Sequence, residues 1–308
     1  MRNVLLFAGA SLIWGSTWLG IKLQLSQVPP ILSVGYRFCL AALILLFYCR
    51  LRRMPLAFSR RDHFFMALMG ATLFGLSYCG SYLATGYMTS GLVAVVFSTI
   101  LMWNIFNLRV FMGQPVAWRA FAGGVMGLTG IAVVFRHDLA AFAATRGLIG
   151  LMIALGAAYM ASAGNVIGSH TARNGIPITQ ANAFGMTYGG LLTLGIHFAA
   201  GGRPAMDWSI GYLGPMLYLT IFGSIAAFGC YMRLISRIGA EYAAYVTLVA
   251  PVIALALSTV FEDYRWTADA LVGVAMVLAG NLIILTPRSV IRRFFHRISG
   301  GALPLMPQ

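Results

Sequence analysis

Ten stretches of about twenty apolar residues, separated by short polar connections, run through almost the whole chain. A helix needs roughly 20 apolar residues to cross about 30 Å of hydrocarbon, because every backbone N–H and C=O must be bonded within the segment. Charged residues are only 9% of the 308, against about 25% in a soluble domain. The sequence therefore predicts an all-α membrane protein with ten transmembrane helices. The expected spans are 3–24, 31–50, 64–85, 91–111, 117–135, 148–169, 178–199, 211–232, 241–261 and 268–285.

The connections leave no room for a soluble domain. The longest of them, Arg50 to His63 and Arg136 to Gly147, are too short to enclose a core. The first apolar run continues well past Ala8-Gly9-Ala10, which favours a retained helix over a cleaved signal peptide. Any function is therefore expected inside the helix bundle.

Basic residues are distributed unevenly between the two sides of this predicted bundle. If the N-terminus is cytoplasmic, 15 of the 21 Lys and Arg residues fall on the cytoplasmic side, five fall outside and Arg37 lies within the membrane. This bias follows the positive-inside rule and places both termini in the cytoplasm. The net charge of +14 therefore indicates how the chain is oriented, and the basic residues are expected to contact anionic lipids of the bilayer. A nucleic-acid partner is not expected.

The chain is predicted to contain an internal repeat. Pro30 opens the second span and Pro177 the seventh, while Trp118 and Trp266 introduce the fifth and tenth, at an offset of 147–149 residues. Each unit would hold five helices, so two consecutive units would have opposite orientations in the membrane, the 5+5 inverted arrangement of alternating-access carriers. The expected divisions are a first repeat at 1–136, an external linker at 137–147, a second repeat at 148–287 and a basic cytoplasmic tail at 288–308.

Several short motifs also resemble a known family. They are Leu12-Ile13-Trp14-Gly15-Ser16, Tyr36-Arg37-Phe38, Tyr82-Leu83-Ala84, Ser90-Gly91-Leu92-Val93-Ala94, Gly113-Gln114-Pro115, Arg237-Ile238-Gly239-Ala240, Val249-Ala250-Pro251-Val252, and Glu262 ahead of Gly273 and Ala279-Gly280. In this order the chain resembles the EamA type of the drug/metabolite transporter superfamily. The resemblance implies a 5+5 bundle with a central cavity that exports amino acids or similar metabolites. Gln114 departs from the pattern, which often has Glu there.

Arg37 is the sharpest polar signal within a predicted span. A guanidinium can bind a substrate carboxylate with two hydrogen bonds, but it can also snorkel to the surface or satisfy helix-end carbonyls. Lys22 lies nearer the surface, where snorkelling is the expected behaviour. The acidic residues all fall in connections or at helix ends. Facilitated diffusion or exchange is therefore favoured over proton coupling through a membrane-embedded carboxylate.

Aromatic, hydroxyl and amide side chains in the predicted spans form the candidate substrate site, together with Arg37. Such a wall suits a ligand with an apolar side chain and a zwitterionic head. The alternative is ordinary packing, interfacial aromatic belts and amides that bridge helices. Pro251 is a candidate hinge, or else a static kink. The candidates are Trp14, Ser16, Thr17, Arg37, Phe74, Tyr78, Tyr82, Phe97, Trp103, Asn104, Asn165, Phe228, Tyr231 and Tyr245.

The function favoured by the sequence is a secondary transporter of the inner or plasma membrane that exports amino acids or related metabolites. Efflux of hydrophobic or cationic drug-like compounds is the alternative, while a channel or an intramembrane enzyme is disfavoured. No histidine has a partner at metal-ligand spacing, and the four cysteines show no C-x-x-C pair. No catalytic residue, metal or cofactor is expected, and the oligomeric state is expected to be a monomer or weak homodimer.

Overall fold

The computed structural model describes residues 2–25, 28–113, 115–136, 146–238 and 243–286, and within these ranges all regular structure is helical. The predicted linker falls mostly outside this part of the chain, as do the tail and Gln114. The helices are α1 (Arg2–Leu23), α2 (Pro30–Leu51), α3 (Arg60–Met69), η1 (Gly70–Leu76), α4 (Ser77–Thr85), α5 (Ser90–Phe97), α6 (Ile100–Met112), α7 (Trp118–Val134), α9 (Arg146–Arg173), α10 (Ile178–Ala199), α11 (Ile210–Tyr218), η2 (Leu219–Ala226), α12 (Ala227–Ile238), α14 (Val246–Phe261) and α15 (Ala268–Leu285).

The helices have the length and hydropathy of a multi-pass membrane protein, as the sequence predicts. Seven helical segments in the described residues are long and apolar enough to cross a bilayer, and α7 and α14 are shorter apolar helices. The 22-residue α10 falls short of that set in hydropathy rather than in length. It carries the amides of Gln180 and Asn182 among several glycines.

Three of the predicted spans are not uniform α-helices. The third continues through α3, the π-helix η1 and α4, and the eighth through α11, the π-helix η2 and α12. The fourth is divided into α5 and α6 by a turn at Ser98 and Thr99. The third also begins at Arg60, four residues before the predicted start, because Ser59 and Asp62 form a capping box in which each side chain accepts from the other's backbone N–H.

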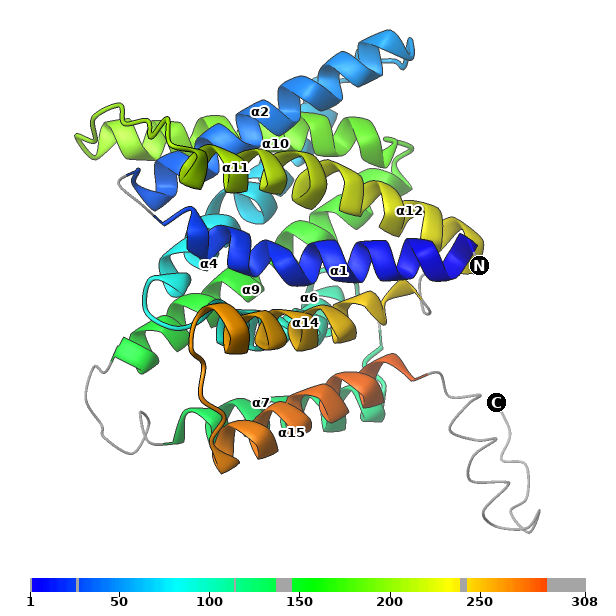
Figure 1. The fold of residues 1–308 in the computed structure, drawn as a ribbon. Coiled ribbons are helices and arrows are strands. Elements are labelled where there is room, and N and C mark those ends of the chain that lie inside the picture. Colours follow the sequence, from blue (N-terminus) through cyan, green and yellow to red (C-terminus); the bar gives the residue numbers. More distant parts are fainter. Residues whose placement is uncertain (1, 26–27, 114, 137–145, 239–242, 287–308) are drawn as a thin grey trace, which may run out of the picture.

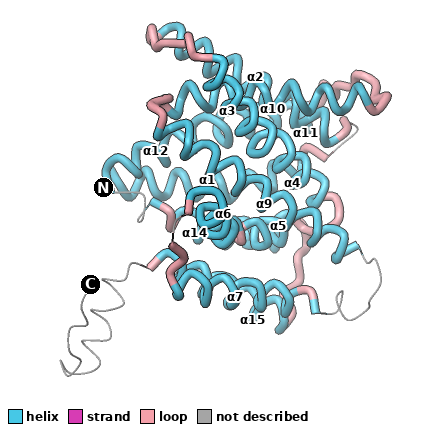
Figure 2. The backbone as a smooth tube through the Cα atoms, turned by 180° about the vertical axis from the view of Figure 1, so that it is seen from behind, coloured by secondary structure: helices cyan, strands magenta, loops and turns pink. Residues whose placement is uncertain are grey.

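Two pairs of helices form the flanks of the molecule, α2 with α10 and α7 with α15 (Figures 1 and 2). In the second pair, a Cβ on Gly123 would lie 2.5 Å from the Gly280 carbonyl oxygen, and one on Gly130 would lie 2.5 Å from that of Gly273. The two backbones are therefore in contact. The helices run antiparallel, because the later glycine of α7, Gly130, contacts the earlier glycine of α15, Gly273. The absence of side chains permits this approach.

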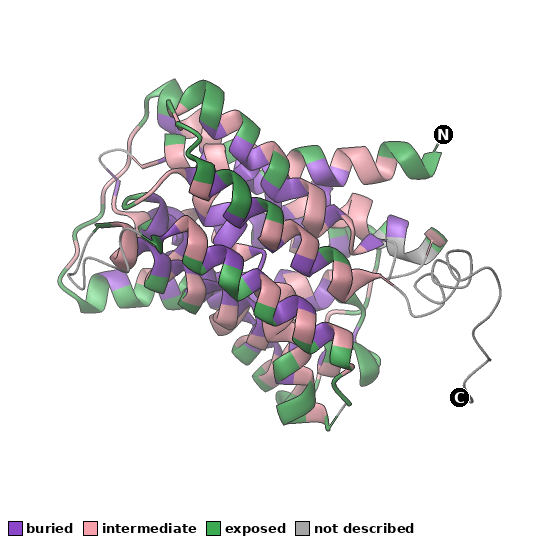
Figure 3. Cartoon of the chain, turned by 90° about the horizontal axis from the view of Figure 1, so that it is seen from below, coloured by how far each residue is buried: buried purple, intermediate pink, exposed green. Residues whose placement is uncertain are grey.

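The remaining helices pack in an exchanged pattern between the two halves of the chain. Helix α1, from the first half, packs on α14 and α12 of the second, while α9, from the second half, packs on α4, α5 and α6 of the first. The π-helices share this pattern, since η2 begins 149 residues after η1. Buried residues follow the inward faces of these helices (Figure 3).

Hydrogen bonds and an ion pair join the connections at one end of the bundle. Lys22 Nζ donates to the Thr85 carbonyl at 3.0 Å, and Arg146 Nη2 donates to the Gly86 carbonyl at 3.1 Å. An ion pair of 2.6 Å between Arg136 and Asp269 joins α7 to α15. The start of α1 and the end of α15 lie together at the opposite end (Figure 1).

Candidate functional site

The structure gathers the predicted site residues into three groups rather than one. The first is an aromatic group on α1 and α12. The Trp14 ring lies 5.3 Å from that of Phe228 and 5.0 Å from that of Tyr231, between ring centroids. All three side chains are only half-buried, so part of each ring is accessible to a ligand.

Two predicted hydroxyls on α1 lie next to this aromatic group. Ser16 Oγ is 2.6 Å from the hydroxyl of Tyr218 on α11, a bond between the two halves of the chain. Thr17 is buried, and its hydroxyl donates to the Trp14 carbonyl at 2.7 Å. Both hydroxyls also bond to carbonyls of their own helix, Ser16 to Leu12 at 2.6 Å, but only Ser16 is half-buried and has a partner on another helix.

The second group lies between α6 and α9. Asn165 Nδ2 donates to Asn104 Oδ1 at 3.4 Å, a long bond between two half-buried amides. One turn further along α6, Asn107 Nδ2 donates to Ser162 Oγ at 2.9 Å, and both of these residues are fully buried. The Asn107 pair bridges the helices, whereas the Asn104 pair is weakly bonded and accessible.

Aromatic rings flank the same two helices. Trp103 packs edge-on against Tyr159 with ring centroids 5.3 Å apart. Phe97, the last residue of α5, packs against Trp18 at 5.2 Å. The turn that follows Phe97 is held by the hydroxyls of Ser98 and Thr99, which donate to carbonyls three residues earlier.

The third group, called here the Arg37 cluster, consists of Arg37, Tyr78, Tyr82, Gln24 and Ser224. The Arg37 guanidinium lies 4.8 Å from the Tyr78 ring centroid, and its Nε donates to Ser224 Oγ at 3.2 Å. Tyr82 donates its hydroxyl proton to Gln24 Oε1 at 2.6 Å. Arg37 is 1% exposed and Tyr82 is 0% exposed, so this cluster is a buried polar network rather than an open wall.

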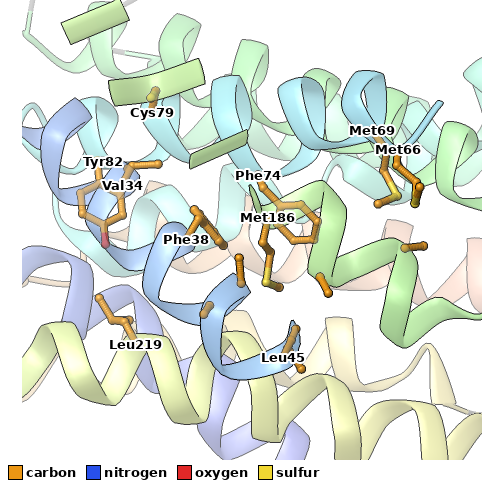
Figure 4. Close-up of a cluster of buried hydrophobic side chains, with 14 of the residues drawn as sticks. Val34, Phe38, Leu45, Met66, Met69, Phe74, Cys79, Tyr82, Met186 and Leu219 are labelled. Atoms are coloured by element: carbon orange, nitrogen blue, oxygen red, sulfur yellow. The ribbon is translucent and has the colours of Figure 1, made fainter. Parts of the chain in front are cut away.

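Phe74, a third candidate from the same predicted span as Tyr78 and Tyr82, lies beside this cluster. Phe38 lies between the first two of them, with ring centroids 5.3 Å from Phe74 and 4.7 Å from Tyr78. Figure 4 shows Phe38, Phe74, Tyr82 and Leu219 around the same apolar interior. Phe74 is fully buried and Tyr78 is only half-buried.

A second buried polar network, called here the Glu262 cluster, joins α5 to the end of α14. The Ser90 backbone N–H donates to the Glu262 carboxylate at 3.0 Å, and the Ser90 hydroxyl also donates to it. Ser258 Oγ accepts from the Gly91 N–H at 2.7 Å and donates to Glu262 at 2.7 Å. A carboxylate therefore caps the first turn of α5, where the helix dipole favours negative charge.

Tyr245 and Pro251 belong to none of these groups. Tyr245 is half-buried in the turn before α14, and Pro251 is buried inside α14. Whether Pro251 acts as a hinge stays a prediction.

Sequence reasoning missed several partners of the predicted residues. Gln24, Trp18, Tyr159, Ser224 and Ser258 each contact a predicted residue or complete a network. Gln24 carried a signal, since it is a polar residue at the end of an apolar run. In the described residues no group of three His, Cys, Asp or Glu side chains could hold a metal ion.

Comparison with known proteins identifies the family. The sequence model of the EamA-like transporter family matches residues 1–136 and 148–286. "Uncharacterized inner membrane transporter YedA" of Escherichia coli (strain K12) is 28% identical over 282 residues, which cover 87% of each chain. "Uncharacterized transporter YvbV" of Bacillus subtilis (strain 168) is 25% identical over 92% of each chain. "Protein PagO" of Salmonella typhimurium is 22% identical over 94% of this chain and 96% of its own.

The fold also occurs among solved structures. One crystal structure that is 18% identical superposes with a TM-score of 0.67 and covers 95% of this chain and 98% of the other. The family match spans nearly all of the described helices, and YedA and YvbV, which match over 87% and 92% of their own length, are named as transporters. The chain therefore belongs to the EamA-like transporter family and is a multi-pass transporter of the inner membrane.

Proposed function

We propose that this transporter exports amino acids or related small metabolites by alternating access between two inverted five-helix units, residues 1–136 and 148–287. In this arrangement ten helices cross the membrane and both termini are cytoplasmic. The proposal carries the family assignment further, to an orientation, a mechanism and a substrate class.

The exchanged packing is the single observation that carries the mechanism. Each half contributes one helix, α1 or α9, that packs mainly on the other half, and the flanking pairs are antiparallel. Two units of opposite orientation that hold each other in this way can rock about their shared interface. The recurrence of a π-helix at an offset of 149 residues supports the same pairing of the halves.

The half-buried groups support the substrate class. The aromatic group of Trp14, Phe228 and Tyr231 offers apolar faces, and the Asn104–Asn165 pair offers amides whose bond of 3.4 Å is easily exchanged for one to a ligand. A neutral amino acid with an apolar or aromatic side chain matches both surfaces.

The position of the acidic residues supports exchange or facilitated diffusion. In the described ranges, each Asp and Glu lies in a connection, in a first helical turn or directly after a helix end. A proton-coupled carrier usually keeps a carboxylate within the membrane. Substrate gradients would therefore drive the transport cycle.

The Glu262 cluster is a contact that such a cycle has to release. It ties α5 of the first half to α14 of the second near one end of the bundle, and the adjoining Lys22 and Arg146 bonds lie at the same end. Opening toward that side would separate these groups, with Pro251 as the place where α14 bends.

Counterflow in liposomes tests the proposal. Purified protein is reconstituted in vesicles preloaded with one unlabelled amino acid, and uptake of labelled phenylalanine, threonine or cysteine is followed. Saturable exchange is expected for at least one of them. Trp14→Ala should lower the initial rate about tenfold, while Trp118→Ala, at a ring that is 76% exposed on the outside of α7, should leave it unchanged.

Absence of exchange across the amino-acid panel, from protein shown to be folded, would overturn the substrate class. The same vesicles would then be tested with hydrophobic cations, which can also rest on aromatic faces. Flux that does not saturate and is not stimulated from the opposite side would overturn alternating access itself.

A further inference from the structure

A buried cation without a described counter-ion lies in the Arg37 cluster. The side chain is 1% exposed, and Arg37 forms no ion pair with a carboxylate among the described residues. Its Nε donates to Ser224, while Nη1 is buried without a hydrogen-bond partner. A guanidinium does not lose its proton in a protein, and an uncompensated charge away from water is unfavourable. Counting only the described residues, the site is therefore one formal negative charge short of neutrality.

Aromatic rings compensate only part of this charge. The guanidinium carbon lies 4.8 Å from the Tyr78 ring centroid and 5.1 Å from that of Phe38. Such contacts stabilise a cation through the ring quadrupole, but they accept no hydrogen bond in the plane of the guanidinium. The Nη1 hydrogens still require an acceptor.

A second unpartnered donor belongs to the same network. Gln24 is 0% exposed, and its Nε2 is buried without a partner, while its Oε1 accepts from Tyr82. If the amide is turned over, Nε2 donates to the Tyr82 oxygen and the Tyr82 hydroxyl proton becomes the free donor. Gln24 also interacts with the Tyr212 hydroxyl, which is 2.9 Å from Ser33 Oγ, and the Tyr82 hydroxyl interacts with Arg37. These neutral hydroxyls do not supply the negative charge that the guanidinium lacks.

The surroundings keep the site small and dry. A Cβ on Gly223, in the π-helix η2, would lie 3.3 Å from Arg37 Nη2 and 2.8 Å from the Thr17 methyl group, so this glycine gives the guanidinium its space. Phe38, which contacts the guanidinium, belongs to one buried apolar cluster with Val34 and Leu219 (Figure 4). Low polarity strengthens the attraction between a cation and an anion.

We infer that Arg37, Gln24 and Tyr82 bind one small monovalent anion, of halide or carboxylate size, between α2, α4 and η2. Two sources supply this chemistry, inorganic chloride and the carboxylate of a transported solute. The carboxylate source rests on the proposed transport of amino acids, whereas the chloride source does not. A phosphate dianion is disfavoured, because the Arg37 cluster holds a single cation and Lys22 is bonded to the Thr85 carbonyl instead.

Thermal unfolding of the purified protein in detergent tests this inference without any transport assay. The protein is exchanged into sodium gluconate as the reference salt and is titrated with chloride, bromide or acetate at constant sodium concentration. A saturable rise in melting temperature is expected for chloride and bromide if the source is inorganic, and for acetate if it is a carboxylate. Equal responses to all anions, gluconate included, would overturn the inference.

Two variants and a matched control localise the effect. Arg37→Gln should abolish the saturable rise, and Gln24→Leu should weaken the apparent affinity about tenfold. Arg146→Gln is the control, because Arg146 also lies over a tyrosine ring, 5.6 Å from that of Tyr87, but at an exposed position. A response that persists unchanged in Gln24→Leu contradicts the assigned site even if Arg37→Gln fails to fold. If anions raise the melting temperature but no counterflow is seen, the proposed function fails and this inference stands. Counterflow without any anion effect would be the reverse.

Discussion

The Glu262 cluster and the Arg37 cluster are both buried polar networks that join the two halves of the chain, but they differ in how completely they are bonded. In the first, Glu262 and Ser258 accept from two backbone N–H groups and from the Ser90 hydroxyl. In the second, donors on Arg37 and Gln24 remain unpartnered. A fully bonded network stabilises one arrangement of helices, whereas unused donors leave the protein ready for a ligand.

Removing the carboxylate of the Glu262 cluster has the largest expected effect on stability. Glu262→Leu leaves the Ser90 N–H without an acceptor and takes the carboxylate away from the Ser90 and Ser258 hydroxyls, which can then bond only to each other. We expect this change to lower the free energy of unfolding by about 3 kcal/mol. Chemical denaturation in detergent micelles measures the change. Asp263→Asn, at the next residue in the same connection, is the control and should stay near the parent protein.

Removing the Ser258 hydroxyl should have a smaller effect. Ser258→Ala deprives the Gly91 N–H of its acceptor but leaves the Glu262 bonds to Ser90 in place. The expected loss is about 1.5 kcal/mol in the same assay. A loss as large as that of Glu262→Leu would mean that the cluster acts as an indivisible unit.

The long hydrogen bond between Asn104 and Asn165 should contribute less to stability than the bonds of the two clusters. A double-mutant cycle of Asn104→Ala and Asn165→Ala should give a coupling energy of roughly 0.6 kcal/mol or less, the usual value for polar contacts between membrane helices. The buried Asn107–Ser162 pair, at 2.9 Å, serves as the reference and should couple more strongly. A larger coupling energy for Asn104–Asn165 than for Asn107–Ser162 would mean that the Asn104 pair serves to hold the helices together.

Only a small effect on stability is expected where the buried network is incomplete. Arg37→Met in gluconate buffer removes an uncompensated charge and restores apolar packing, so the free energy of unfolding should stay within about 1 kcal/mol of the parent. Counterflow by the same variant should nevertheless fall. A loss above 3 kcal/mol in unfolding experiments would assign Arg37 to the fold rather than to a ligand.

Local signals in the sequence account for most helix bounds. Pro30 at the first helical position and Arg50 in the last turn delimit α2 within one residue of the prediction. The early start of α3 was also legible, because Ser59 and Asp62 have capping-box spacing, but hydropathy alone passes over it. The break after Phe97 carries no Gly or Pro, and the π-helices carry no distinctive pattern, so these features depend on packing that the sequence does not display.

The sequence singles out candidate site residues by their type and position, but not their pairings. Arg37 stands out as a charge in an apolar span, and the aromatic residues stand out by type. Their partners come from distant positions, such as Ser224, 187 residues from Arg37, or Glu262, 172 residues from Ser90. Residue types alone do not distinguish a cavity wall from a buried network. The sequence therefore groups Tyr82, which is fully buried, with aromatic residues that are accessible.

The glycine contacts between α7 and α15 restrict how this part of the molecule can change over evolutionary time. Where two side chains clash, a substitution on one helix can be rescued by a smaller residue opposite. At Gly123–Gly280 and Gly130–Gly273 the opposite residue has no side chain left to remove. A side chain gained on either helix can be accommodated only by moving the whole backbone. These positions should therefore tolerate no compensatory pairs, and sequence drift is confined to the outward faces of the two helices.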